Sequence, residues 1–226
     1  MTILMTYILS IETATRNCSV ALSLNGETIA CKEISDAGYS HAEKLHVFME
    51  EILKENQLVF QDLSAIAVSQ GPGSYTGLRI GVSAAKGLCY SLAIPLIAID
   101  TLETLAKKLT IEEGLILSML DARRMECYTA FFDSNHHKTR EIKAEIIDEN
   151  SYHDIDETIH IIGDGAAKCQ SVLIDKKFVF HNEIEFPSAN DMSSIAFEKY
   201  KKSDTVDVAY FEPFYLKDFM MTTSSK

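Results

Sequence analysis

The chain has 226 residues, of which 46% are hydrophobic and 24% charged. These fractions are typical of a globular protein with a sizeable core and exclude a disordered or collagen-like chain. Its 33 acidic and 21 basic residues give a formal net charge of −12, which argues against a protein that binds nucleic acid by itself. The apolar runs are too short to span a bilayer, and the first residues lack the pattern of a signal peptide, so we expect no membrane association.

The cysteines and histidines favour neither a disulfide framework nor a metal site. The five cysteines are far apart and form no C-x-x-C pair, which is typical of free thiols in a reducing cytoplasm. His41 and His46 are five residues apart, so on a helix they lie on different faces, unlike the ligands of an H-E-x-x-H site. The other histidines have no cysteine or carboxylate at ligand spacing, and we therefore expect no metal site.

The first half of the chain predicts a mixed α/β unit. Short apolar or alternating runs at residues 7–11, 18–24 and 28–31 predict three strands. Asn25-Gly26 joins the last two as a tight hairpin, because a type I′ turn requires positive φ at both central residues. Ser40 and Glu43 form a capping box, which predicts the start of a helix. Further strands are expected at 63–69 and 94–99, with a helix at 78–91 between them.

The second half predicts a similar but less regular unit. We expect strands at residues 115–120, 126–132, 139–147 and 159–162, and a last amphipathic helix at 188–202. Two α/β units of like order suggest a duplicated fold with a degraded second copy, although the sequence itself shows no repeat.

A glycine-rich segment between a predicted strand and a predicted helix is the most distinctive feature. Gly71, Gly73 and Gly77 do not have the spacing of a P-loop, of a dinucleotide-binding fingerprint or of a nucleophile elbow. Two interpretations remain open, a phosphate-binding loop of another kind and a tight turn that leads into a closely packed helix.

Two predicted helices carry more apolar and small residues than a single buried face needs, which is consistent either with core packing or with a partner surface. The residues concerned are Leu45, Phe48, Met49, Ile52, Gly77, Leu78, Gly81, Val82 and Ala85. Separately, Glu12-Thr13 and Gly163-Asp164-Gly165 follow predicted strands and resemble the phosphate- and nucleotide-side turns of actin-like ATPases.

Several segments together resemble one family. They are ILSIETATRNCSVAL, GPGSYTGLRIGVSAAKGL, DARRMECYTAFFD, GDGA at 163–166 and PFYLK at 213–217. In this order they are similar to the TsaB (YeaZ) family, bacterial proteins of tRNA threonylcarbamoyladenosine biosynthesis. The departures are small: Glu12 replaces the usual Asp, Tyr75 the commoner Phe and Lys217 the usual Arg.

The resemblance implies an actin-like (ASKHA, RNase H-like) α/β fold with two lobes, residues 1–103 and a reduced second lobe at 104–226. It further implies a non-catalytic scaffold partner of TsaD, the paralogue that attaches the threonylcarbamoyl group to the adenosine beside the tRNA anticodon. TsaD carries an H-x-x-x-H metal motif, whereas no histidine pair here has that spacing. The ATPase TsaE would join through this complex, tRNA would be contacted only indirectly, and a homodimer would form when TsaD is absent.

The resemblance also implies that the partner surface lies on the two helices whose apolar and small residues are given above. Glu12, Thr13, Gly163, Asp164 and Gly165 are then candidates for a vestigial nucleotide site, with no cofactor required. Two alternatives are a glycoprotease or metallopeptidase-like hydrolase, and a small actin-fold ATPase. The first needs a metal triad or an activated nucleophile, and the second needs the strand-end Asp and a complete second lobe.

Overall fold

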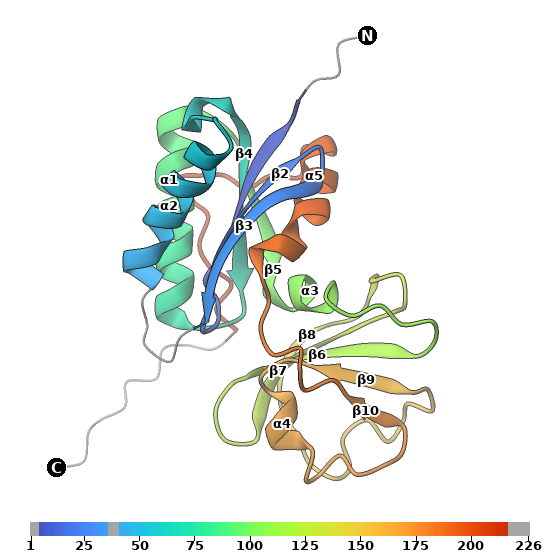
Figure 1. The fold of residues 1–226 in the computed structure, drawn as a ribbon. Helices are drawn as coiled ribbons and strands as arrows, with labels where there is room; N and C mark the ends of the chain where they lie inside the picture. Colours follow the sequence, from blue (N-terminus) through green and yellow to red (C-terminus); the bar gives the residue numbers. More distant parts are fainter. Residues whose placement is uncertain (1–4, 36–40, 217–226) are drawn as a thin grey trace, which may run out of the picture.

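The computed structural model describes residues 5–35 and 41–216, which form two lobes, each built on a five-stranded sheet (Figure 1). The strands of the first sheet are β1 (Tyr7–Glu12), β2 (Asn17–Leu24), β3 (Glu27–Ser35), β4 (Leu63–Gly71) and β5 (Leu96–Asp100). They lie in the order β3-β2-β1-β4-β5, with β1, β2 and β3 antiparallel and with β4 and β5 parallel to β1. Asn25 and Gly26 have φ values of 52° and 91°, which confirms the predicted tight turn.

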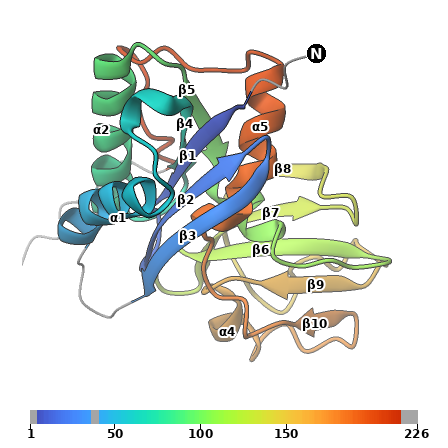
Figure 2. The same cartoon turned by 45° about the horizontal axis from the view of Figure 1, so that its top comes forward.

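Helices cover both faces of the first sheet. Neighbouring helices α1 (His41–Glu55) and α2 (Tyr75–Leu92) lie on one face, whereas α5 (Ser193–Lys201) and the 3-10 helix η2 (Ala189–Met192) lie on the other (Figures 1 and 2). A short 3-10 helix, η1 (Phe60–Asp62), precedes β4. Ser74 caps α2 by accepting a hydrogen bond from the Gly77 N–H at 3.3 Å. Ser40, the predicted cap of α1, lies outside the described residues.

The second sheet repeats the strand order of the first. Its strands are β6 (Leu115–Asp121), β7 (Glu126–Phe132), β8 (Lys138–Ile146), β9 (Ile159–Ile162) and β10 (Phe178–Phe180), in the order β10-β9-β6-β7-β8. As in the first sheet, three consecutive strands are antiparallel and the last two are parallel to the first of them. The topology thus confirms a duplicated α/β fold.

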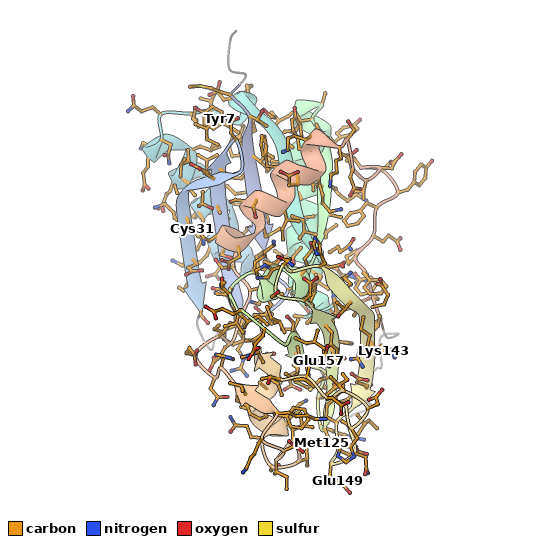
Figure 3. All side chains as sticks on the ribbon, turned by 90° about the vertical axis from the view of Figure 1, so that its right-hand side faces the viewer. Tyr7, Cys31, Met125, Lys143, Glu149 and Glu157 are labelled. Carbon is orange, nitrogen blue, oxygen red and sulfur yellow. The ribbon has the colours of Figure 1, made fainter. Side chains whose placement is uncertain are left out.

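The second copy is the reduced one. Its helix α4 (Ala166–Cys169) has four residues, and α3 (Thr101–Ala106), which connects the lobes, has six, compared with 15 for α1 and 18 for α2. Neither α3 nor β10 was predicted, because elements this short show no measurable periodicity. Figure 3 shows the two lobes end to end, with Tyr7 and Cys31 in the first lobe and Met125 and Glu149 in the far part of the second.

The end of the described chain returns to the first lobe. The predicted division assigned residues 104–226 to the second lobe and is wrong for residues 189–216. Met192 and Ile195 pack with Ile97 on the face of the first sheet opposite α1 and α2, and the Val206 N–H donates to the Leu96 carbonyl at 2.9 Å. The reason is that this face of the sheet is apolar and needs a cover that the first hundred residues do not supply.

The described residues contain no helix long and apolar enough to cross a membrane. All five cysteines are free; Cys31 is exposed and the other four are buried.

Candidate functional site

The apolar stripe of α1, predicted as a partner surface, faces the core of its own lobe. Leu45, Met49 and Ile52 are buried among residues of the first sheet, and Phe48 is half-buried at the edge of the same cluster. An amphipathic helix turns its apolar stripe to the nearest apolar surface, and here that surface is the sheet. The prediction of a partner surface is therefore wrong for the three buried residues.

The predicted residues of α2 are internal as well. Val82 and Ala85 belong to the same core, and Leu78 is also buried; the exposed fraction of Val82 is 3%. A Cβ atom on Gly77 would lie 2.0 Å from the Thr13 carbonyl oxygen, and one on Gly81 would lie 2.3 Å from Thr13 Oγ1. These glycines therefore allow α2 to pack closely on the end of β1, which favours the structural interpretation of the glycine-rich segment.

A different face of these helices is exposed, which we call the outer face. It comprises Glu43, His46, Val47, Glu50 and Lys54 on α1, and Thr76, Arg79, Ser83, Gly87, Tyr90 and Ser91 on α2. Arg79 is the one charged residue among these six of α2 and most of the others are small, while Tyr90 is 86% exposed at the carboxyl end. A Cβ atom on Gly87 would have no neighbour within 4 Å among residues 5–35 and 41–216. The sequence did not predict this face, because the apolar and small residues at helical spacing are those that pack on the sheet.

Glu12, the last residue of β1, is a buried acid with a raised pKa. Its side chain is fully buried, Oε1 accepts a hydrogen bond from the Ala14 N–H at 2.6 Å, and Oε2 has no hydrogen-bond partner among the described residues. Burial raises the pKa of Glu12 to about 7, although hydrogen bonding from Ser69 and the Ala14 N–H counters part of the rise.

The backbone that follows Glu12 is already occupied by the glycine-rich segment. Thr13 Oγ1 donates to the Gly77 carbonyl at 2.8 Å, and the Ser74 N–H donates to the Ala14 carbonyl at 2.6 Å. A nucleotide phosphate approaching this turn would find the Thr13 hydroxyl and the Ser74 N–H already hydrogen-bonded within the protein. Behind them lies the buried carboxyl group of Glu12. These residues do not fit a phosphate site.

The Gly-Asp-Gly turn of the second lobe also serves packing. Gly163 has φ of 104°, and a Cβ atom there would lie 2.0 Å from the Met119 carbonyl oxygen. A Cβ atom on Gly165 would lie 3.1 Å from Cys127 Sγ and 3.1 Å from the Leu120 carbonyl carbon of β6, a less crowded position. Asp164 Oδ1 accepts the Asp121 N–H at 2.9 Å, which ties the turn to the end of β6.

The two candidate nucleotide segments are not in direct contact; the interaction between the lobes here is electrostatic. Burial raises the pKa of Asp164, and the charge of Arg16 from the first lobe counteracts this rise. No hydrogen bond joins Glu12 or Thr13 to residues 163–165 in the described part of the chain.

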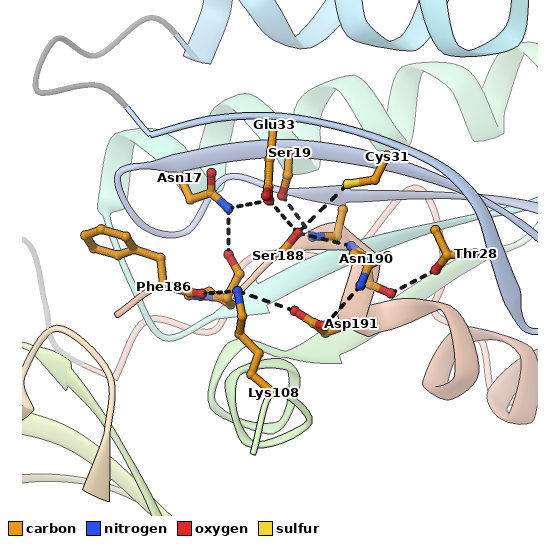
Figure 4. A network of polar contacts seen from close by, with 12 residues as sticks. Asn17, Ser19, Thr28, Cys31, Glu33, Lys108, Phe186, Ser188, Asn190 and Asp191 are labelled. Atoms are coloured by element: carbon orange, nitrogen blue, oxygen red, sulfur yellow. Dashed lines mark hydrogen bonds and ion pairs between the residues drawn. The ribbon is translucent and has the colours of Figure 1, made fainter. Parts of the chain in front are cut away.

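A polar network that sequence reasoning missed holds the returning chain on the first sheet (Figure 4). Asn17 Nδ2 donates to Glu33 Oε2 at 3.2 Å and to the Pro187 carbonyl at 3.0 Å. Ser188 Oγ donates to the same Glu33 oxygen at 2.7 Å. Lys108, which follows α3, forms an ion pair with Asp191 at 3.7 Å. Its members are separated by up to 170 residues, so no local pattern could reveal it.

One histidine pair also went unpredicted. His160 Nδ1 and His181 Nε2 lie 3.0 Å apart at the β9–β10 side of the second sheet. Within residues 5–35 and 41–216, no three histidine, cysteine or carboxylate side chains are grouped to hold a metal ion.

Comparisons with known proteins agree on one family. The TsaD family, described as tRNA N6-adenosine threonylcarbamoyltransferase, matches residues 35–211. The TsaB protein of Escherichia coli K12 is 33% identical over 221 residues, covering 93% of this chain and 94% of the relative. The Bacillus subtilis 168 TsaB is 40% identical over 125 residues, covering 55% of this chain and 54% of that relative.

A solved structure supports the fold. YeaZ from Pseudomonas aeruginosa superposes with a TM-score of 0.83 at 23% identity, covering 94% of this chain and all of the neighbour. The duplicated α/β topology, the reduced second lobe and the near full-length similarity to the E. coli protein lead to the same conclusion. The chain belongs to the TsaB family, within the wider TsaD family.

Proposed function

We propose that this chain is a non-catalytic subunit that acts in tRNA threonylcarbamoyladenosine biosynthesis by binding a TsaD-type transferase through the outer face of α1 and α2. TsaE would join through that complex, tRNA would be contacted indirectly, and the assembly would act in the cytoplasm. The pathway follows from the names of the relatives. The docking face is inferred from the α2 helix, and one residue of it carries the proposal.

That residue is Gly87. Glycine in the interior of a helix costs about 1 kcal/mol relative to alanine, so it is retained where a side chain would obstruct something. Gly77 and Gly81 are explained by Thr13, but no described residue lies within 4 Å of a Cβ atom placed on Gly87. A helix of another subunit that packs against α2 at this point would explain it, because small residues allow close approach of two helix backbones.

The surroundings of Gly87 suit such a contact. Ser83 and Ser91, one turn away on either side, are also small and exposed, and Tyr90 supplies an exposed aromatic ring. Interface centres are depleted in charge and enriched in aromatic residues, whereas their rims are polar. The charged residues of α1, among them Glu50 and Lys54, would then form part of the rim.

Support for a non-catalytic role comes from the packing duties of the residues that resemble nucleotide ligands. Thr13, Gly77 and Gly81 hold α2 to β1, and Asp164 holds a turn to β6. We therefore propose that the subunit requires no cofactor of its own. Incubating the isolated chain with ATP tests this, since sustained phosphate release would favour an actin-fold ATPase instead.

The docking proposal is tested by Gly87→Arg, with Ser194→Arg as the matched control. Ser194 is exposed on α5, on the opposite face of the first sheet. Arginine is a good helix former, so neither change should lower the melting temperature appreciably. The TsaD of the same organism should bind Ser194→Arg like wild type, but its Kd for Gly87→Arg should rise by about 100-fold or more. Equal binding of the two variants would contradict the proposed face.

We also propose that a second copy of the chain occupies the same face when the transferase is absent. Gly87→Arg should then be monomeric in light scattering where wild type is dimeric. Addition of TsaD should convert the wild-type dimer to a heterodimer. A homodimer that persists in the variant would show that the two contacts use different surfaces.

A further inference from the structure

The last described residues run alongside α2 in the opposite direction to the helix. We call residues 207–216 the C-terminal strap. Near the carboxyl end of α2, Lys86 Nζ donates to the carbonyl oxygens of Ala209 at 3.2 Å and Phe211 at 2.8 Å. Near the amino end, Arg79 Nε donates to the hydroxyl of Tyr215 at 3.1 Å. Figure 2 shows the chain after α5, coloured red, crossing the end of the first sheet to reach α2.

The carboxyl end of the strap is held by backbone and aromatic contacts. The Phe214 N–H donates to the Gln70 carbonyl at 2.7 Å, and the Tyr215 ring lies 5.0 Å from the Tyr75 ring. The Arg79 guanidinium lies 3.9 Å above the Tyr75 ring. A Cβ atom on Gly71 would lie 2.7 Å from the Phe214 carbonyl oxygen, so this glycine leaves room for the strap.

The aromatic residues of the strap divide between two directions. Phe211 packs on the core of the first lobe, whereas Tyr210 is 85% and Phe214 41% exposed. An isolated exposed ring needs no explanation, but these two lie on a segment tied to α2 along its length. The first lobe therefore presents three adjacent strips on this side: α1, the outer part of α2, and the strap.

We propose that the C-terminal strap is the third strip of the docking face, with Tyr210 and Phe214 in contact with the TsaD-type partner and with Lys86 and Arg79 as positioning residues. The inference rests on the proposed function, because it assumes that the partner docks on the outer face of α2. A body that covers Gly87 and Tyr90 lies next to the strap, and stable complexes bury about 800 Å² on each partner, an area to which the strap would add beside α1 and α2.

The contact residues are tested with the double variant Tyr210→Ser/Phe214→Ser. The matched control is Ile146→Ser/Ile174→Ser, which removes two apolar side chains of the second lobe that are 73% and 82% exposed. Calorimetric titration with TsaD should show a Kd raised about tenfold or more for the strap variant. The control should remain within about twofold of wild type. Equal Kd values for the two variants would overturn the inference.

The positioning residues are tested with Lys86→Met and Lys86→Arg. Only the arginine retains a cation that can donate to the carbonyl oxygens of Ala209 and Phe211, so it should rescue binding that methionine weakens by about tenfold. Unchanged TsaD affinity in Lys86→Met, whatever its melting temperature, would overturn the positioning role.

Gly87→Arg separates this inference from the proposed function. If that variant loses TsaD while the strap double variant binds like wild type, docking on α2 stands and the strap is excluded. If Gly87→Arg binds like wild type, the proposed function fails at its docking face, and weakened binding by the strap variant would then require a docking face on the strap alone.

Discussion

Glu12→Gln should stabilise the protein in a pH-dependent manner. An acid whose pKa rises on folding binds a proton in the folded state that the unfolded chain has already lost, so stability falls as the pH increases between the two pKa values. For Glu12 these are 4.5 and about 7. Since one pKa unit corresponds to about 1.4 kcal/mol, wild type should lose about 2.5 kcal/mol between pH 5 and pH 8 through this one residue. The raised pKa of Glu12 arises chiefly from burial and in smaller part from the charge of Asp191, and the charge of Lys108 offsets only part of the rise.

Glutamine resembles the protonated acid and does not titrate. Its carbonyl can accept the Ala14 N–H, as Glu12 Oε1 does at 2.6 Å. Urea unfolding at pH 5, 6, 7 and 8 should show the stability difference between variant and wild type growing by about 2.5 kcal/mol across this range in favour of glutamine. Glu27→Gln, at an exposed position of β3, is the control and should show no such growth. Parallel curves for Glu12→Gln and wild type would refute the reasoning.

The remaining predictions concern α2 and the second lobe. Gly81→Ala should lower the free energy of unfolding by about 1–3 kcal/mol, because its Cβ would meet Thr13 Oγ1, while Gly87→Ala should raise it by about 1 kcal/mol in the isolated chain. Urea unfolding of both variants checks this, and a change of the same sign in both would contradict the assignment of the two glycines. Burial and the nearby His181 lower the pKa of His160 from 6.5, so an NMR titration should show it losing its proton at lower pH in wild type than in His181→Asn. An unchanged His160 titration in the variant would exclude that electrostatic contact.

The hairpin and the alternation of strands and helices were predictable because their signals are local. The turn at Asn25-Gly26 requires positive φ at two adjacent positions, and few other residue pairs adopt that conformation. The duplication was also visible as a repeated order of elements. By contrast, the return of residues 189–216 to the first lobe depends on which sheet face lacks a cover, and that is known only when both sheets are assembled.

The docking face shows how far composition alone can lead. Leu45, Met49 and Ile52 were predicted to contact a partner because they are apolar. Because they are apolar, they pack instead in the core of their own lobe. Gly87 was not predicted to lie on a partner surface, because its role cannot be distinguished from those of Gly77 and Gly81 until the space around each glycine is known. Likewise, His160 and His181 are 21 residues apart and meet only because β9 and β10 pair.

The most direct test of a scaffold role is light scattering after size exclusion of the chain mixed with the TsaD of its own organism. A single species with the mass of one chain plus one TsaD, abolished by Gly87→Arg and retained by Ser194→Arg, is the expected result. A chain that elutes apart from TsaD at every concentration tested would contradict the central claim.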